Sequence, residues 1–257
     1  MTDSLTKPVS PAKSALSLDD IPVERRPQHI AVIMDGNGRW AQRRGLPRIE
    51  GHRQGVASVR RITEEAARLD LGQLTLYCLS SENWKRPQAE LDFLMHLLEQ
   101  YLIEERTVLL DEKIRLRVIG SREGIPDSVL REMDKTIEMT SAAPGMTLCL
   151  AVNYGSRAEI ANSMRAIAQE VSHGTLAPQD VTEELIADRL YTAGMPDPDL
   201  MIRTAGEMRV SNFLLWQISY AELWVTDQCW PEFAEADLHA AIRNFAARDR
   251  RYGGLNA

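Results

Sequence analysis

The chain has 257 residues, 44% of them hydrophobic, which allows one large domain or two small ones with a substantial core. A formal net charge of −7 argues against a general nucleic-acid binder, and three widely spaced cysteines favour free thiols in a reducing cytoplasm. No apolar signal segment opens the chain, and the apolar stretch Val210–Ala221 is too short to span a bilayer, so we expect a cytoplasmic protein.

Along the chain, apolar strand-like runs alternate with helical patterns after residue 27. Residues 1–27 are rich in Ser, Pro, Asp and Lys without periodicity, which predicts a disordered tail before a single domain over residues 28–257. The expected strands are His29–Met34, Gln73–Leu79, Arg115–Gly120, Met146–Val152, Leu200–Thr204 and Glu222–Val225. The expected helices are Gly51–Leu69, Gln88–Lys113, Pro126–Ser141, Arg157–Ser172, Thr182–Tyr191 and Glu235–Arg250. The alternation predicts an α/β fold with a mostly parallel sheet covered by helices.

The helix expected at Gln88–Lys113 carries more apolar surface than one side of a sheet requires. It either walls a deep apolar cavity or belongs to the core, and core is the usual fate of an apolar helical stripe.

The first strand leads directly into an aspartate and two glycines. Asp35 stands at the strand end, where ligands bind in open α/β sheets, and the following segment from Gly36 to Arg39 brings glycine N–H groups and a guanidinium. His52 opens the next helix, and the arginines in and around this region are Arg39, Arg43, Arg44, Arg48 and Arg53. The pattern predicts a cation at Asp35 and a phosphate beside it; the alternative is a glycine turn with a solvated basic face.

A second polar segment, Ser80–Pro87, follows the second strand and would lie at the same edge of the sheet. Its Ser, Asn and Arg side chains can hold phosphate oxygens or a leaving group, and Trp84 offers a large apolar surface beside them. The alternative is a helix-capping turn with Ser81 as the cap.

A third segment brings Arg203 to that edge and carries Arg209 and Ser211 two residues apart, so that an extended backbone would project both to one side. Glu222 stands among apolar neighbours, where a carboxylate needs a cation or a salt bridge. Asp35 and Glu222 together could hold Mg²⁺, which prefers oxygen ligands and often shares substrate phosphates. A ligand with a diphosphate head and an apolar tail would fit these residues.

These motifs resemble those of the cis-prenyltransferase family, and most closely of its undecaprenyl diphosphate synthases. The resemblance spans about residues 28–254, with the motifs in order. They are His29–Trp40, Arg48 with Gly51 and His52, Thr75–Pro87, Asn153–Gly155, and Asp199–Glu222.

The resemblance implies a single α/β domain with a parallel sheet of about six strands, an apolar product tunnel and a homodimeric state. It implies a Mg²⁺-dependent transferase that condenses isopentenyl diphosphate repeatedly, with cis geometry, onto an allylic diphosphate such as farnesyl diphosphate. The product would be a long polyprenyl diphosphate, such as undecaprenyl diphosphate, which carries peptidoglycan precursors for the cell wall. Release of so apolar a product implies transient contact with the inner face of the plasma membrane.

The resemblance also implies roles for individual residues. Asp35 and Asn83 would be catalytic, and Asp35 and Glu222 would bind Mg²⁺. The allylic diphosphate would bind Gly36, Asn37, Gly38, Arg39, Arg48 and His52. Isopentenyl diphosphate would bind Arg203, Arg209 and Ser211. The primer would be positioned by Trp40, Trp84 and Arg86, and further substrate contacts would come from Ser80, Ser81, Glu82 and Val210.

Two residues depart from the family pattern. Ala205 replaces a glycine found in many relatives, which predicts a negative φ there. Met208 stands where several bacterial relatives carry a histidine close to the metal, and a thioether suits Mg²⁺ badly.

A cis-prenyltransferase of shorter product length is one alternative, and three other classes of function compete with it. A Mg²⁺-dependent phosphohydrolase with Asp35 as nucleophile would want a second aspartate at position 37, where this chain has Asn37. A non-catalytic subunit of a two-component prenyltransferase would lack much of the loop chemistry that is present. A dinucleotide-binding module is excluded, because no G-x-G-x-x-G motif follows a strand.

Overall fold

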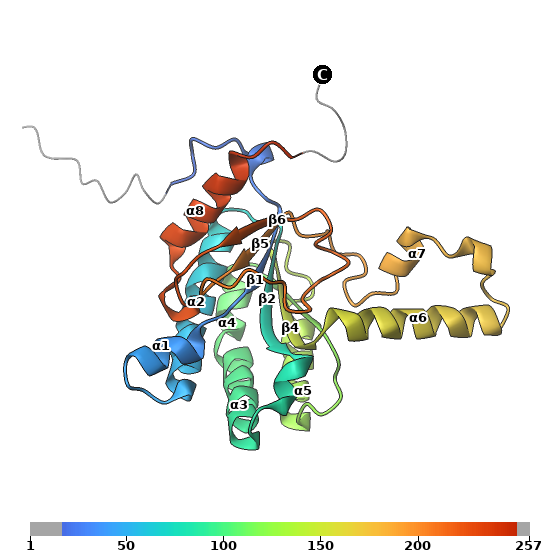
Figure 1. Ribbon diagram of the computed structural model, residues 1–257, viewed down its shortest axis with the longest axis horizontal. Helices are drawn as coiled ribbons and strands as arrows, with labels where there is room; N and C mark the ends of the chain where they lie inside the picture. The colour runs from blue at the N-terminus through green and yellow to red at the C-terminus, as the bar shows by residue number, and fades with distance from the viewer. Residues whose placement is uncertain (1–16, 251–257) are drawn as a thin grey trace, which may run out of the picture.

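The computed structural model describes residues 17–250 and shows a six-stranded parallel sheet with the strand order β3-β4-β2-β1-β5-β6 (Figure 1). All five strand pairings are parallel, which confirms the α/β prediction. The strands are β1 His29–Ile33, β2 Gln73–Ser80, β3 Arg115–Ile119, β4 Thr147–Tyr154, β5 Leu200–Arg203 and β6 Glu222–Val225. Each differs from its expected range by two residues or fewer at either end.

The helices are α1 Asn37–Arg43, α2 Arg48–Arg68, α3 Gln88–Glu104, α4 Arg106–Asp111, α5 Asp127–Thr140, α6 Ser156–Ser172, α7 Glu183–Ala187 and α8 Glu235–Ala246. Short 3₁₀ turns cover Val23–Arg25, Ser81–Lys85, Pro178–Asp180 and Trp230–Glu232. The sequence pattern missed α1, and it made the helices at Thr182–Tyr191 and Glu235–Arg250 too long. Among residues 17–250, none of the helices combines the length and the apolar character needed to cross a membrane.

The helix expected over Gln88–Lys113 is two helices, α3 and α4, which meet at Glu105. Glu105 is buried, and its carboxylate accepts a hydrogen bond from Arg60 Nε of α2 at 2.7 Å. The break between the two helices therefore coincides with an ion pair to a buried carboxylate, which an apolar stripe in the sequence does not reveal.

The core lies on both faces of the sheet, since alternate residues of a buried strand point to opposite sides. Ile30 and Val32 of β1 belong to the larger cluster, under α2, α3, α5 and α8, whereas Ala31 and Ile33 belong to a smaller one with Phe213. Helices α6 and α7 extend away from this body as an arm (Figure 1).

The expected tail ends earlier than residue 27. Residues 1–16 lie outside the described residues, but Leu18 and Ile21 are buried in the larger core cluster. The Arg243 guanidinium of α8 holds this segment by donating to the Ser17 carbonyl at 2.6 Å and to Asp20 Oδ1 at 2.8 Å. Two apolar residues in a polar stretch carry no periodicity, so the sequence pattern could not show their burial.

Candidate active site

The three polar segments found in the sequence meet at the carboxyl ends of β1, β2 and β5, which we call the rim. Strand β1 pairs with β2 on one side and with β5 on the other, and Ile33 is the register partner of Arg203. Asp35, the turn at Ser81–Lys85 and the loop after Arg203 therefore converge, as strand ends of a parallel sheet must.

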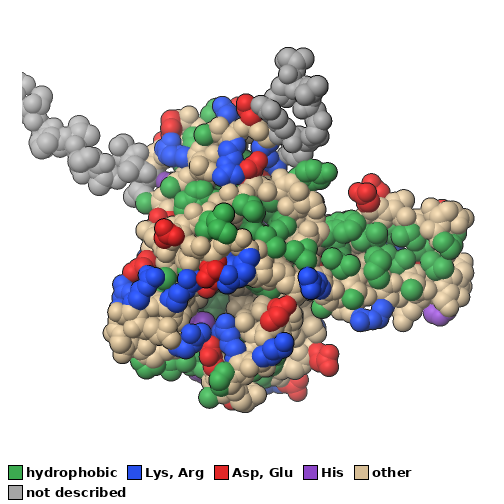
Figure 2. All heavy atoms as spheres, in the orientation of Figure 1, with side chains coloured by type: hydrophobic (Ala, Val, Ile, Leu, Met, Phe, Trp, Pro, Cys, Tyr) green, Lys and Arg blue, Asp and Glu red, His purple; other side chains and the backbone are tan. Residues whose placement is uncertain are grey.

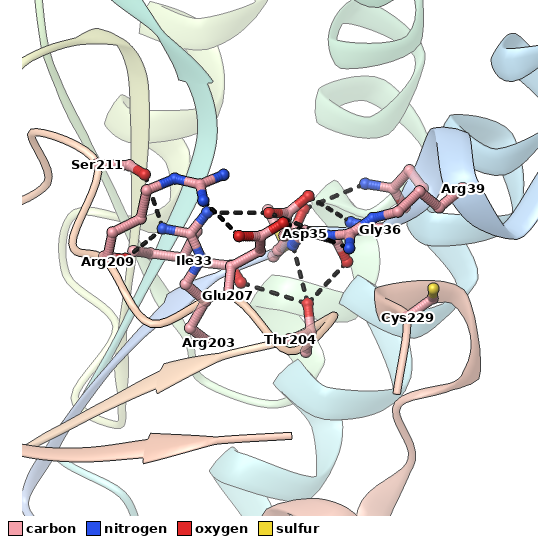
Figure 3. A network of polar contacts seen from close by, with 12 residues as sticks. Ile33, Asp35, Gly36, Arg39, Arg203, Thr204, Glu207, Arg209, Ser211 and Cys229 are labelled. Atoms are coloured by element: carbon pink, nitrogen blue, oxygen red, sulfur yellow. Dashed lines mark hydrogen bonds and ion pairs between the residues drawn. The ribbon is translucent and has the colours of Figure 1, made fainter. Parts of the chain in front are cut away.

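Arg203 joins the first and third segments at the centre of the rim (Figure 3). Its side chain is 4% exposed; Nη2 donates to Asp35 Oδ2 at 2.9 Å, and Nη1 donates to Ser211 Oγ at 2.7 Å. Arg39 Nη2 lies 3.5 Å from the same Asp35 oxygen, and the Gly36 N–H donates to Asp35 Oδ1 at 2.6 Å. The two terminal nitrogens of a buried guanidinium are thus paired with a carboxylate and a hydroxyl from segments far apart in the chain.

Asp35 is ionised in this setting. Burial by itself raises the pKa of the carboxyl, but the Arg203 hydrogen bond, the Gly36 N–H and the charges of Arg203 and Arg39 outweigh it, so the pKa lies below its ordinary value. At neutral pH the site therefore holds a carboxylate beside the guanidinium groups of Arg203 and Arg39.

Two further residues of the rim escaped the sequence reasoning. The Thr204 hydroxyl accepts the Asp35 N–H and donates to the Asp35 carbonyl, both at 2.8 Å, which fixes the backbone that carries the carboxylate. Glu207 forms ion pairs with Arg39, at 3.4 Å, and with Arg209. An acid between two arginines is a signal that the sequence offered for Glu207, whereas nothing in the sequence distinguishes Thr204.

The loop after Arg203 corrects the expectation for Ala205. Its φ is +69°, not negative, although alanine pays a steric penalty in that region. Hydrogen bonds from the Ala205 and Gly206 N–H groups to the carbonyls of Gln228 and Thr226 hold this conformation. Tertiary contacts therefore override the local preference.

A cavity of about 400 Å³ opens beside Asp35. Its outer part is lined by polar residues, namely Asp35, Asn37, Arg39, Arg48, His52, Ser80, Asn83 and Arg86. Its inner part is lined mainly by apolar residues of α2, α3, β2 and β4, namely Val56, Val59, Cys78, Leu79, Leu94, Met95, Leu97, Leu98, Tyr101, Leu150 and Val152. Figure 2 shows a hollow in the surface bordered by basic and acidic side chains. Polar entrance and apolar interior form one continuous space.

Two buried polar atoms at the entrance have no hydrogen-bond partner among the described residues, Asn37 Oδ1 and His52 Nε2. Burial, followed by the charge of Arg86, lowers the pKa of His52 to about 4, so its imidazole is neutral at pH 7. Arg48 lies directly over Gly38, where a Cβ would come within 2.8 Å of its guanidinium. Buried groups without partners are costly, so this entrance is suited to a polar ligand.

The side chains of the second polar segment, Ser80–Pro87, line two different surfaces. Ser80 and Asn83 line the cavity, and Asn83 Oδ1 accepts the Ser80 N–H at 3.0 Å, so Ser80 rather than Ser81 is the cap of the turn. Ser81 and Trp84 instead line a separate depression, and the indole N–H of Trp84 donates to Asn153 Oδ1.

The two tryptophans expected to touch the primer are not among the residues that line the cavity. Trp84 faces Asn153, and the Trp40 ring lies under the Arg44 guanidinium, 4.3 Å from its centroid. Of the third segment, Val210 packs against the smaller core cluster and the Arg209 side chain is 61% exposed.

Glu222 lies at the other end of the sheet, which corrects its expected pairing with Asp35 within one chain. Glu222 is the register partner of Leu200, whereas Arg203 at the rim pairs with Val225. Three residues of strand separate the two levels by about 10 Å. Glu222 forms an ion pair with Arg248 instead, and among residues 17–250 no three His, Cys, Asp or Glu side chains are grouped to hold a metal.

The sequence matches known proteins over nearly its whole length. Residues 33–253 match the family described as "Putative undecaprenyl diphosphate synthase". The isoprenyl transferase of Rhodopirellula baltica is 59% identical over 230 residues, which cover 90% of this chain and 94% of that protein. The isoprenyl transferase of Geobacillus kaustophilus is 49% identical over 245 residues, which cover 93% and 95% of the two chains.

Solved structures of two prenyl diphosphate synthases have folds similar to that of this chain. Lavandulyl diphosphate synthase from Lavandula x intermedia, solved with dimethylallyl diphosphate, superimposes with a TM-score of 0.88 at 37% identity, covering 90% of this chain and 100% of the other. A "probable undecaprenyl diphosphate synthase" from Campylobacter jejuni gives a TM-score of 0.73 at 32% identity and covers 89% and 99%. The parallel sheet, the polar rim and these likenesses lead to one conclusion: the chain belongs to the undecaprenyl diphosphate synthase family and is an isoprenyl transferase.

Proposed function

We propose that this transferase condenses isopentenyl diphosphate repeatedly onto an allylic diphosphate, with farnesyl diphosphate as the primer and cis geometry at each new double bond. The carrying observation is the cavity, whose entrance has guanidinium groups and unpartnered polar atoms and whose interior is apolar. A diphosphate head with a growing isoprenoid tail has the same two halves.

The allylic diphosphate would bind at the entrance, where Arg39, Arg48 and His52 face it together with the Gly36–Gly38 backbone. Two guanidinium groups bind phosphate oxygens and neutralise charge as the diphosphate leaves. The unpartnered Asn37 Oδ1 and His52 Nε2 would gain partners on binding.

Isopentenyl diphosphate would bind on the other side of Asp35, at Arg203, Arg209 and Ser211. Its double bond supplies the electron pair for the new carbon–carbon bond, the allylic carbon loses diphosphate, and a proton leaves the isopentenyl unit. Asn83 is a poor base, and its amide oxygen already accepts the Ser80 N–H, so we assign it an orienting role through its amide nitrogen.

Asp35 would be the one protein ligand of Mg²⁺ within this chain. An ionised, half-exposed carboxylate next to a diphosphate site fits that ion, which is commonly held by one or two carboxylates together with substrate phosphates and water. Bound there, Mg²⁺ would supply charge neutralisation for the departing diphosphate. Glu222 fits this role only if it comes from another chain.

The product would be a long polyprenyl diphosphate, with undecaprenyl diphosphate as our proposal and a shorter chain as the alternative. The apolar inner cavity would house the growing chain, and α3 would form one of its walls. Such a product is insoluble in water, so we also propose that it leaves at the inner face of the plasma membrane for use in cell-wall synthesis.

A homodimer is our proposal for the assembled enzyme, and the arm formed by α6, α7 and the residues between them supports it. Helix α6 has a buried side, with Ser156, Glu159, Ser163 and Ile167, whereas Met164 of the same helix is 38% exposed. Figure 2 shows hydrophobic side chains gathered along this arm. An apolar face of this kind commonly marks an interface.

The test is incubation of the purified protein with farnesyl diphosphate, labelled isopentenyl diphosphate and Mg²⁺, with Asp35→Ala as the control. We expect a ladder that ends in one long product and is lost on adding EDTA and in the control. Incorporation into shorter products would overturn the proposed length alone. No incorporation from farnesyl, geranyl or geranylgeranyl diphosphate would overturn the proposed reaction and point to a subunit that needs a partner.

A further inference from the structure

A second polar network lies behind the rim and is centred on Asn212. The Asn212 backbone carbonyl accepts the Ser156 N–H at 2.8 Å, and its side-chain Oδ1 accepts the Arg157 N–H at 2.9 Å, both at the start of α6. Its Nδ2 donates to Glu82 Oε1 at 2.7 Å. One asparagine therefore ties together α6, the loop after Arg203 and the turn that carries Asn83.

The backbone around Asn212 is held in an uncommon conformation. Ser211 and Asn212 have φ values of +47° and +60°, a region that few residues other than glycine adopt and that asparagine tolerates best. Phe213 anchors the loop from below, because it is fully buried and stacks on Tyr77 with ring centroids 4.3 Å apart. Left-handed residues of this kind persist only where surrounding contacts fix them.

The approach of the two loops depends on Gly155. A Cβ at that position would clash with Ser81 Oγ and lie 2.8 Å from Asn212 Nδ2, so a larger residue would crowd the place where the turn and Asn212 meet. The chain neighbours of the two bonded residues belong to the reaction site as proposed above: Ser211, before Asn212, accepts from Arg203 Nη1, and Asn83 is the residue after Glu82. Glu82 itself is exposed and is not among the residues that line the cavity.

We propose that Asn212 is a positioning residue, and that its hydrogen bond to Glu82 sets the separation between Asn83, which lines the cavity, and Ser211 with Arg203 at the rim. Glu82 then acts on the reaction through Asn212 and not by touching substrate. The proposal rests on the function proposed above, since it concerns how the two diphosphate sites are held relative to each other. Small errors in such a separation lower the rate of a two-substrate reaction steeply.

Exchanging the donor and the acceptor of the Asn212–Glu82 hydrogen bond tests the positioning role of Asn212. Asn212→Asp keeps the shape and the acceptor for the Arg157 N–H but sets two carboxylates against each other, and we expect kcat to fall about tenfold at pH 8, the worth of one charge-assisted hydrogen bond. Glu82→Gln alone retains an acceptor for Asn212 and should cost less. The double variant re-forms the bond with the glutamine amide as donor to the aspartate, and its kcat should return to within about threefold of the Glu82→Gln value.

A pH profile gives a second readout. In Asn212→Asp, one proton shared between the two carboxylates restores the bond, so the activity of this variant relative to wild type should rise as the pH falls from 8 to 6. The other groups that act on Glu82 are Ser80, Ser81 and the Tyr77 hydroxyl. Burial, followed by the charge of Glu82, raises the pKa of Tyr77, which therefore stays neutral over this range.

The control is Asn162→Asp, the same change at an exposed position of α6, which should leave kcat and its pH profile unchanged. A double variant no more active than Asn212→Asp, or a Glu82→Gln variant that raises the KM for a substrate more than it lowers kcat, would overturn the inference and return Glu82 to substrate binding. Wild-type protein that elongates no primer would overturn the proposed function itself, so the two failures are distinguishable.

Discussion

At the scale of single residues, the site depends on one buried guanidinium. Arg203 donates to the Asp35 carboxylate from one terminal nitrogen and to the Ser211 hydroxyl from the other. It therefore fixes the proposed metal ligand and a proposed phosphate-binding hydroxyl at the same time. This geometry needs the planar fork of arginine, because lysine presents a single point charge. In the proposed reaction, Arg203 would therefore position both Asp35 and Ser211, besides its own proposed contact with isopentenyl diphosphate.

Arg203→Lys should lower kcat/KM for isopentenyl diphosphate by about 10- to 100-fold, because charge-assisted hydrogen bonds contribute roughly 1.5–3 kcal/mol. Steady-state kinetics at a saturating concentration of the allylic primer measures kcat/KM for isopentenyl diphosphate. Arg122→Lys, in an exposed ion pair with Asp134, is the matched control and should not change the rate. Equal effects of the two substitutions on kcat/KM would contradict the proposed role of Arg203 in holding Asp35 and Ser211.

His52 should make stability depend on pH. Burial holds its folded pKa at about 4, below the value of 6.5 for an unperturbed imidazole, so the unfolded chain binds more protons between these two values. The contribution of this group to stability is thus present above pH 6.5 and is lost as the pH falls toward 4. We expect the difference in unfolding free energy between pH 7 and pH 5 to shrink by about 2 kcal/mol in His52→Gln.

Urea unfolding at the two pH values measures this, with His96→Gln on the exposed side of α3 as the matched control. His29 is also buried with a pKa of about 4, so part of the dependence should remain in the variant. An unchanged dependence in His52→Gln would mean that folding does not lower the pKa of His52.

At the scale of elements, α3 is both a core helix and a wall of the cavity, so the two alternatives that the sequence left open are both correct. Met95 and Leu102 belong to the core, while Leu94, Met95, Leu97, Leu98 and Tyr101 line the cavity. The helix stops at Glu105, whose buried carboxylate pairs with Arg60 of α2, a helix that also lines the cavity.

Leu98→Trp should shorten the longest product, because the larger side chain occupies space at the cavity wall. Ile103→Trp is the matched control on the exposed side of the same helix, where Ile103 is 49% exposed. Product length from labelled isopentenyl diphosphate, resolved by chain length, is the measurement. A ladder of wild-type length from Leu98→Trp would place the growing chain elsewhere.

At the scale of the whole molecule, the body contains the candidate site and the arm presents apolar surface. The sheet and its helices build the rim and the cavity, whereas α6 and α7 extend from the body with apolar side chains on their surface (Figures 1 and 2). The start of α6 is nonetheless tied to the rim through Asn212. Any molecule that covers the arm would therefore contact an element that is bonded to the site.

Met164→Glu on the arm should convert the proposed homodimer to a monomer, because burial of an unpaired carboxylate in an interface is costly. Met139→Glu is the matched control, since Met139 on α5 is 47% exposed and lies outside the arm. Light scattering coupled to size-exclusion chromatography gives the masses. If wild type and both variants have the same mass, the arm is not the interface.

The sequence by itself determined the sheet and the place of the site. Each strand was found to within two residues at either end, because apolar runs between turns record burial directly. Asp35, Ser80, Asn83 and Arg203 were placed at one edge because parallel strands bring their carboxyl ends together. The family resemblance, carried by the same motifs, was confirmed by the comparisons.

Only the tertiary structure decided which of these side chains meet. Glu222 starts its strand and so lies at the far end from Asp35, which spacing along the chain does not show. Trp84 turns toward Asn153, Ala205 adopts a positive φ, and Asn212 joins three segments. These outcomes depend on hydrogen bonds between residues far apart in the sequence. Local patterns of hydrophobicity carry no information about such pairings, because they report burial and not partners.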